Sequence, residues 1–216
     1  LLLENVYEAL ENAGIPLSES VSSNTSVYVG SFGDDYKTIL NTDFESWVKY
    51  KGTGVYNSIL ANRISWFYDF KGASVTLDTA CSSSLVAVHM ACQDLRLGES
   101  RMVSSVVGGV NIIGHPLLVH DLSKLGALSP DGVCYTFDER ANGYSRGEGV
   151  GTIVLKRLSD AIEDGDTIRA IIRASGCNQD GKTAGIFVPS VQAQERLIRD
   201  TYEKAGLDRT RTTYLE

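Results

Sequence analysis

Apolar positions recur along this chain with two alternating periods, that of an amphipathic helix and that of a strand. Leu3, Val6 and Leu10 recur at helical spacing and predict a helix over 2–13 that ends at Gly14. The same signals predict the remaining elements. Further helices are expected over 34–40, 57–68, 82–97, 116–125, 159–163 and 191–205, and strands over 25–31, 74–77, 102–111, 150–156, 168–175 and 213–215.

The order of these elements predicts an α/β fold. Strands alternate with helices, and the strand over 102–111 is largely apolar, which is typical of a largely parallel sheet covered on both faces. Gly98 is expected to end the helix over 82–97. The pair Gly108 and Gly109 is expected to let another backbone come close to the sheet.

Charge and cysteine content narrow the possible functions. The 20 basic and 27 acidic residues give a net charge of −7, which argues against a nucleic-acid-binding surface. No apolar run is long enough to span a bilayer, and no signal peptide is visible. The four cysteines are widely spaced and contain no C-x-x-C pair, so we expect neither a metal site nor a disulfide scaffold. A reducing, cytoplasmic setting fits this pattern.

Cys81 is the candidate nucleophile. It lies in "VTLDTACSSSL" (75–85), where the strand pattern stops and the helix pattern begins. A free cysteine is most often a small buried hydrophobic residue. At the start of a helix, however, unpaired N–H groups favour a thiolate, and a sharp strand-to-helix turn presents a nucleophile. We expect Asp78 and Thr79 to cap this turn.

No base for Cys81 is evident among the histidines. His89 lies eight residues further along the predicted helix, about 12 Å away, and is expected to be a core or supporting residue. Nothing in the spacing of His115 or His120 assigns them to the site.

The polar segment 129–147 predicts a long ordered loop. We expect ion pairs of Arg140, Arg146 and Glu148 to hold this loop. The glycines of "RGEGVG", at 147, 149 and 151, lack the spacing of a phosphate-binding loop and are expected to form a tight turn.

Longer motifs resemble a known family. The segment "LDTACSSSLVAVHMAC" (77–92) resembles the active-site segment of β-ketoacyl synthases, in particular the ketosynthase domain of type I, fungal iterative polyketide synthases. Three further segments resemble other landmarks of that family. They are "GTGVYNSILANRISWFYDFKG" (52–72), "LGALSPDGVCYTFDERANGYSRGEGVGTIVLKRLSDAIEDGD" (125–166) and "IRASGCNQDGKTAGIFVPS" (172–190).

The resemblance implies a thiolase-like fold, with most of its N-terminal half in about 1–165 and the start of its C-terminal half in about 166–216. It also implies that Cys81 accepts an acyl group and that decarboxylative Claisen condensation with malonyl-carrier protein then extends a polyketide or fatty acyl chain. The family's two histidines and lysine lie downstream of the last residues, "TTYLE", so the chain alone is expected to be inactive.

The resemblance further implies partners but no directly bound cofactor or metal. The partners are acyl and malonyl thioesters on the phosphopantetheine arm of an acyl carrier protein, and a second copy of the domain that pairs through the strand at about 74–77. Two alternatives stay open: a thiolase-like acyltransferase that does not decarboxylate, and a non-catalytic dimer partner, against which Cys81 itself counts.

Overall fold

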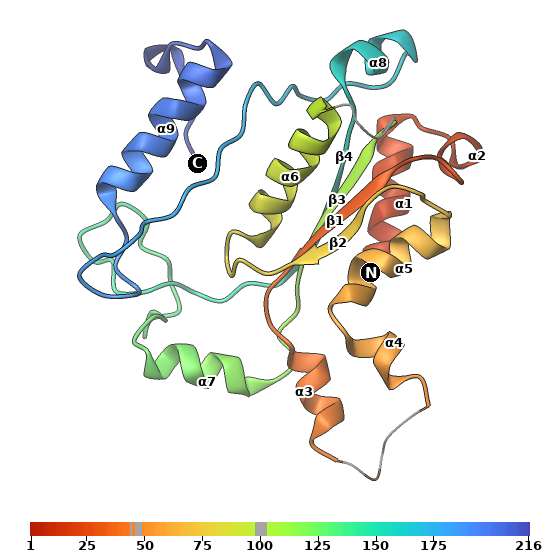
Figure 1. Cartoon of the computed structure of the whole chain (residues 1–216). Helices are drawn as coiled ribbons and strands as arrows, with labels where there is room; N and C mark the ends of the chain where they lie inside the picture. The colour runs from red at the N-terminus through yellow and green to blue at the C-terminus, as the bar shows by residue number, and fades with distance from the viewer. Residues whose placement is uncertain (44, 46–48, 98–102) are drawn as a thin grey trace.

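A mixed four-stranded sheet forms the centre of the computed structural model, which describes residues 1–43, 45, 49–97 and 103–216. The strands lie in the order β2–β1–β3–β4; the first three are parallel and β4 is antiparallel to β3 (Figure 1). The strands are β1 (Ser26–Ser31), β2 (Ser74–Leu77), β3 (Ser105–Asn111) and β4 (Gly149–Leu155). The helices are α1 (Leu2–Ala13), α2 (Leu17–Ser20), α3 (Asp35–Asn41), α4 (Lys51–Val55), α5 (Ser58–Tyr68), α6 (Ser83–Leu97), α7 (Pro116–Lys124), α8 (Leu158–Glu163) and α9 (Val191–Ala205), with a 3₁₀ turn η1 (Arg209–Arg211).

Helices α1 and α5 cover one face of this sheet (Figure 1). Val27 and Val29 of β1 and Val106 of β3 point to this face because alternate residues of a strand share one side. They pack against Val6 of α1 and Ile64 of α5, and all five side chains are almost completely buried. This cluster is the larger of the two hydrophobic cores of the described chain.

Helix α6 covers the other face, over β1 and β3. Tyr28 and Val107 point to this side and pack against Ala87 and Ala91 of α6. The small alanines let the helix approach the sheet closely. On β4 the residues that face this side include Ile153, which is 44% exposed, so α6 does not extend its cover that far.

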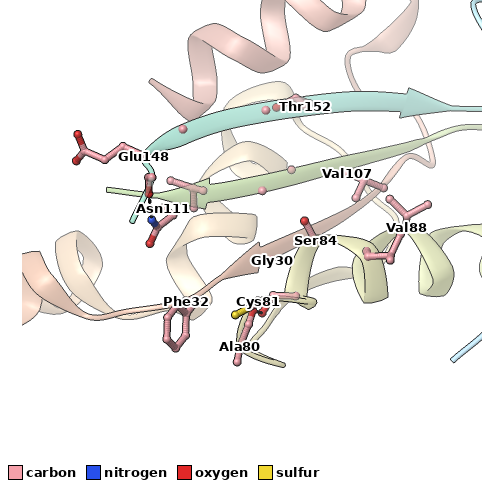
Figure 2. A pocket seen from close by; sticks show the side chains of 18 of the residues that line it. Gly30, Phe32, Ala80, Cys81, Ser84, Val88, Val107, Asn111, Glu148 and Thr152 are labelled. Carbon is pink, nitrogen blue, oxygen red and sulfur yellow. Dashed lines mark hydrogen bonds between the residues drawn. The ribbon is translucent and has the colours of Figure 1, made fainter. Parts of the chain in front are cut away.

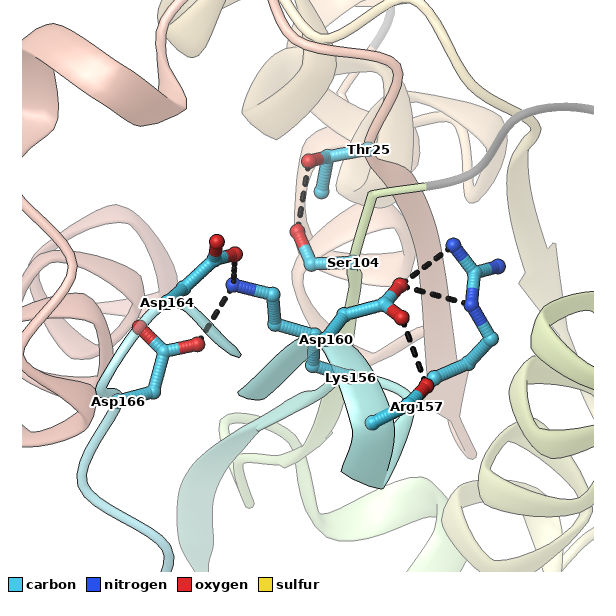
Figure 3. Close-up of polar contacts among 8 residues, drawn as sticks. Thr25, Ser104, Lys156, Arg157, Asp160, Asp164 and Asp166 are labelled. Carbon is cyan, nitrogen blue, oxygen red and sulfur yellow. Dashed lines mark hydrogen bonds and ion pairs between the residues drawn. The ribbon is translucent and has the colours of Figure 1, made fainter. Parts of the chain in front are cut away.

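Polar contacts hold the end of the sheet where β1 and β3 begin (Figure 3). The buried hydroxyls of Thr25 and Ser104 lie 2.8 Å apart and share a hydrogen bond. Lys156, which directly follows β4, forms ion pairs with Asp164 and Asp166, the latter at 2.6 Å. These contacts satisfy polar groups at the edge of the core and leave the opposite end of the sheet free for a site.

The structure confirms most of the predicted elements, including helices on both faces of the sheet, and adds the short helices α2 and α4. The strands predicted over 168–175 and 213–215 are wrong. The first of these segments is extended, but its neighbours are helix ends: Thr167 N–H donates to Ala13, and Arg96 donates to the carbonyl of Arg173. A segment with strand propensity forms no ladder without a neighbouring strand. Gly98 and the first residue of the predicted strand 102–111 lie outside the described residues.

None of the helices in the described part of the chain is long and apolar enough to cross a bilayer.

Candidate active site at Cys81

A cavity of about 770 Å³ opens at the carboxyl ends of the parallel strands, and Cys81 lies in its wall. Ligands of α/β proteins commonly bind at this edge of the sheet. Figure 2 shows Cys81 beside Phe32, with the end of β1 at Gly30 behind it and Asn111 and Glu148 across the opening. Four segments therefore build the cavity: the start of α6, the end of β1, the end of β3, and the residues that lead into β4.

The turn before α6 presents Cys81 to solvent. Asp78 accepts a hydrogen bond from Ala80 N–H at 2.8 Å, and Ser83 Oγ accepts one from Thr79 N–H at 2.8 Å. These bonds confirm the predicted capping by Asp78, whereas Thr79 takes part through its backbone N–H and its hydroxyl. Ala80 has a φ of 55°, a left-handed conformation that costs a non-glycine residue about 1 kcal/mol or more. The bonded side chains hold this strained turn. As a result, Cys81 follows the turn as an exposed residue at the N-terminus of α6.

Two glycines let the first turn of α6 rest directly on the sheet. A Cβ on Gly30 would lie 2.4 Å from the backbone nitrogen of Ser84, and a Cβ on Gly109 would lie 2.9 Å from the side chain of Ser84. The close backbone approach is thus at Gly30, and the prediction that Gly108 and Gly109 receive a backbone is wrong. What meets Gly108 is the side chain of Leu2, on the opposite face.

The four cysteines differ in their surroundings, and none forms a disulfide. Cys92 is buried on α6, and this burial raises the pKa of its thiol. Cys134 Sγ accepts a hydrogen bond from Ser145 N–H at 3.1 Å. Cys81 combines exposure with a place in the cavity wall, which makes it the best-placed nucleophile of the four.

The histidines lie in other surroundings. His89 Nδ1 is 2.9 Å from the hydroxyl of Ser175, so His89 joins α6 to the segment before α9. His115 Nδ1 accepts a hydrogen bond from Leu117 N–H and caps α7. His120 is exposed beside Asp121. None of the three is among the residues that line the cavity of Cys81.

The expected ion pairs of the 129–147 loop form only in part. Arg140 pairs with Asp138 at 2.8 Å, and the guanidinium lowers the pKa of that carboxyl. Glu148 accepts a hydrogen bond from Ile113 N–H at 2.6 Å and so connects this loop to the end of β3. Arg146 lines the cavity, and its buried Nε has no hydrogen-bond partner in the described part of the chain.

The tight turn predicted for the three glycines of "RGEGVG" is also wrong. Gly149 and Gly151 are residues of β4, and none of the three has a positive φ. A Cβ on any of them would meet open space. They line the cavity instead, and their missing side chains keep its wall wide beside β4.

Sequence patterns missed several cavity residues. Gly30 has a detectable signal, because a glycine inside an apolar strand marks a close approach of another segment. Phe32, Asn111 and Tyr144 have none, since their positions in the cavity depend on which strand ends meet. No group of three or more histidine, cysteine or carboxylate side chains suited to a metal ion occurs within the described residues.

Two family models match the chain. One, described as the beta-ketoacyl synthase N-terminal domain, matches residues 1–161; the other, described as the C-terminal domain, matches residues 169–216. The chain is 59% identical over its full length to a highly reducing polyketide synthase of Aspergillus carbonarius (strain ITEM 5010). It is 57% identical to a 6-hydroxymellein synthase of Talaromyces verruculosus. The chain spans 8% of the length of each of these relatives.

Two solved ketosynthase structures have a similar fold. The ketosynthase from module 6 of the bacillaene synthase of Bacillus subtilis 168 is 41% identical, with a TM-score of 0.86 over 95% of this chain and 34% of its own. The oxazolomycin ketosynthase domain of Streptomyces albus JA3453 is 39% identical, with a TM-score of 0.90 over 100% of this chain and 38% of its own. These likenesses confirm the α/β, thiolase-like fold predicted from the sequence.

Proposed function

Because the chain belongs to the β-ketoacyl synthase family, we propose that it forms the nucleophile-bearing part of a ketosynthase domain in a longer polyketide synthase of the fungal, highly reducing kind. In this proposal Cys81 is the acyl acceptor, and the reaction is decarboxylative Claisen condensation. The activity is an acyl transfer followed by carbon–carbon bond formation.

The observation that carries the proposal is the position of Cys81. Its thiol is exposed at the N-terminus of α6, in the wall of a cavity large enough for a thioester and its acyl group. Sulfur both attacks thioesters well and leaves well, so an exposed cysteine in this wall can accept and release an acyl group. The unpaired N–H groups of that terminus also favour the oxyanion that forms during acyl transfer.

The proposed cycle has two balanced steps. The Cys81 thiolate attacks the thioester carbon of an acyl-carrier protein, and the thiolate of the phosphopantetheine arm leaves. A malonyl-carrier thioester then loses carbon dioxide, and the carbon of the resulting enolate attacks the acyl-Cys81 carbonyl. The Cys81 thiolate leaves, and the carrier retains a β-ketoacyl chain two carbons longer.

Acylation and condensation are tested separately in the full-length synthase. Cys81→Ala is expected to abolish acyl transfer from an acyl-carrier protein, measured by mass spectrometry of the peptide that contains residue 81. Condensation should fall by at least about 10³-fold. Cys92→Ala, which removes a buried thiol on the same helix, is the matched control and should leave acylation at residue 81 intact. Undiminished condensation by Cys81→Ala would contradict the proposal, and acylation without loss of carbon dioxide would favour the thiolase-like alternative.

The proposed partners are an acyl carrier protein, whose phosphopantetheine arm delivers the substrates, and a second copy of the domain. Support for a homodimer comes from β2, which lies at the edge of the described sheet and leaves one side of its backbone without a neighbouring strand. Trp66 and Phe67 of α5, the helix that packs on β2, are 81% and 58% exposed. Sedimentation of the intact synthase should give a dimer; a monomer at micromolar concentration would count against this pairing.

We also propose a cytoplasmic location, supported by four unpaired cysteines, and we expect the 216-residue chain alone not to condense. The support for this expectation is that the three histidines within the chain lie outside the cavity of Cys81. Incubation of the purified chain with acyl- and malonyl-carrier proteins checks it, and formation of a β-ketoacyl product would show it to be wrong.

A further inference from the structure

Arg146 is a charged residue in the wall of the Cys81 cavity, and the proposed condensation assigns it no role. It lines the same cavity as Cys81, on the segment between Tyr144 and the start of β4. Its side chain is half-buried, and its Nε is shielded from solvent and unbonded within the described residues. A charged side chain is costly to bury without a counter-ion, so a ligand in the cavity that pairs with the Arg146 guanidinium gains affinity.

No carboxylate of the described chain neutralises Arg146. The other charged residue that lines the cavity is Glu148, whose Oε1 accepts the Ile113 N–H at 2.6 Å. Figure 2 shows the carboxylate of Glu148 turned away from Cys81. Arg140, in the same loop, forms an ion pair with Asp138. Arg146 has no ion pair of this kind within the described residues.

Thr152, the other residue with an unpartnered buried polar atom, also lines the cavity of Cys81, but its side chain points to the other face of the sheet. Its position in β4 is opposite Gly108, and a Cβ on Gly108 would face Leu2 of α1. Directly opposed residues of an antiparallel pair point to the same face, so the Thr152 hydroxyl lies on the α1 side of the sheet. Arg146 is thus the candidate for a polar contact with a ligand in the Cys81 cavity.

We propose that Arg146 binds the carboxylate of the malonyl unit as this unit enters the cavity beside acylated Cys81. A guanidinium matches a carboxylate in charge and geometry and can donate two parallel hydrogen bonds. The malonyl carboxylate lies only a few bonds from the thioester, so it enters the cavity together with the reacting carbon. This inference rests on the proposed condensation, and it deepens that proposal by assigning selection of the charged extender to Arg146.

The proposed contact acts on the substrate before carbon dioxide leaves. An interaction of this kind stabilises the bound substrate and therefore lowers KM rather than raising kcat. The first half-reaction, transfer of an uncharged acyl group to Cys81, involves no carboxylate and should not depend on Arg146.

The test compares wild type, Arg146→Gln and Arg146→Lys in the full-length synthase. Arg146→Gln should raise KM for malonyl-carrier protein by about 10- to 100-fold, the value of a lost charge-assisted hydrogen bond. The rate at which Cys81 is acylated by a carrier protein that bears an uncharged acyl group should stay within about twofold of wild type. This result would also show that the variant is folded. Arg146→Lys should recover part of the lost affinity because it retains the charge but not the planar fork.

Three results would overturn the assignment. The first is a malonyl KM for Arg146→Gln that stays within twofold of wild type. The second is loss of acylation in both variants, which would make Arg146 a structural residue. The third concerns the phosphate of the phosphopantetheine arm. Arg146→Gln should raise KM by the same factor for malonyl-pantetheine and for malonyl-phosphopantetheine. A rise in KM confined to malonyl-phosphopantetheine would mean that Arg146 binds the phosphate.

Failure of the proposed function has a different signature. In that case wild type itself would not acylate Cys81, and no difference between the Arg146 variants would arise.

Discussion

The two faces of the sheet differ in how completely helices cover them. On the α1 and α5 side, Val6, Val27, Val29, Ile64 and Val106 are almost fully buried in one continuous cluster. On the α6 side, a smaller cluster lies beneath one helix, and the surface continues into the cavity of Cys81. The strands contribute alternate residues to both faces, so the same backbone serves packing on one side and a site on the other.

This difference predicts which substitutions should change the stability of the fold and which should change the reactivity of Cys81. Changes on the α1 and α5 face should alter the free energy of unfolding and leave the chemistry of Cys81 in the folded protein unchanged. Changes under the start of α6 should alter both, because that helix is at once a packing element and the support of the nucleophile. Changes of exposed side chains on the uncovered part of the second face, such as Ile153, should alter the free energy of unfolding little, even though Ile153 lines the cavity.

The largest expected effect is on the well-covered face. Ile64→Ala removes a side chain that is 1% exposed and leaves a cavity, so it should lower the free energy of unfolding by about 4 kcal/mol. Urea denaturation of the purified chain measures this loss. Ile198→Ala on α9, where the side chain is 52% exposed, is the matched control and should cost less than about 0.5 kcal/mol.

Reactivity of Cys81 provides the second readout for Ile64→Ala. The rate of alkylation by iodoacetamide under native conditions should equal that of wild type. A slower or faster rate would mean that the two faces are mechanically coupled and that the comparison does not hold.

Gly30→Ala should affect both properties. Its Cβ would lie 2.4 Å from the backbone nitrogen of Ser84, and helix backbone cannot rotate away as a side chain can. Overpacking of this kind should cost about 3 kcal/mol and move the start of α6, which changes the alkylation rate of Cys81. Gly54→Ala on α4 is the control, because its Cβ would meet open space, its φ is not positive and Gly54 does not line the cavity of Cys81. Equal effects of the two substitutions would contradict the role given to Gly30.

The sequence predicted the parts of the molecule that depend on local pattern. Helical spacing predicted α1 and α9 with their glycine ends, and the change of period at Cys81 predicted the strand-to-helix turn. The left-handed conformation of Ala80 has no sequence signal, since alanine disfavours it, and the turn holds it through Asp78 and Ser83.

Features that depend on neighbours were not predictable in the same way. Residues 168–175 have strand propensity, yet the segment lies against the ends of α1 and α6 and forms no ladder. The strand over 150–156 was predicted from the sequence, but its start at Gly149 becomes evident only when β3 lies beside it and Gly149 pairs with Asn111. The cavity itself arises where the ends of separate elements meet, which no single segment encodes.

Tyr28, on the α6 face of the sheet, should make the free energy of unfolding depend on pH in the alkaline range. Burial, and then the nearby charge of Asp94, raises the pKa of Tyr28 from 10.0 to about 12; its hydroxyl donates to Asp94 at 3.1 Å. Between these two values the unfolded chain loses the tyrosine proton while the folded chain keeps it, so ionisation stabilises the unfolded state. Stability from this group is complete below pH 10 and should fall by about 1.4 kcal/mol per pH unit, up to about 2.5 kcal/mol by pH 12.

Tyr28→Phe isolates this contribution. Other groups titrate in the same range, but they cancel when the free energy of unfolding of the variant is subtracted from that of wild type at each pH. The difference should be constant below pH 9.5 and shift in favour of the variant above it. A constant difference up to pH 11.5 would show that Tyr28 is not held in its neutral form by α6.

The smallest effect is expected on the uncovered part of the α6 face. Ile153 of β4 is 44% exposed and points to the same side as Gly151 and Leu155, beyond the cover that α6 provides. Ile153→Thr keeps β-branching and strand propensity, so it should change the free energy of unfolding of the chain by less than about 0.5 kcal/mol. Val106→Thr on the opposite face is the contrasting variant, because it places a hydroxyl in the α1 and α5 core and should cost at least about 1 kcal/mol. Urea denaturation of both variants decides the point: a cost for Ile153→Thr as large as that for Val106→Thr would mean that this face is covered in solution.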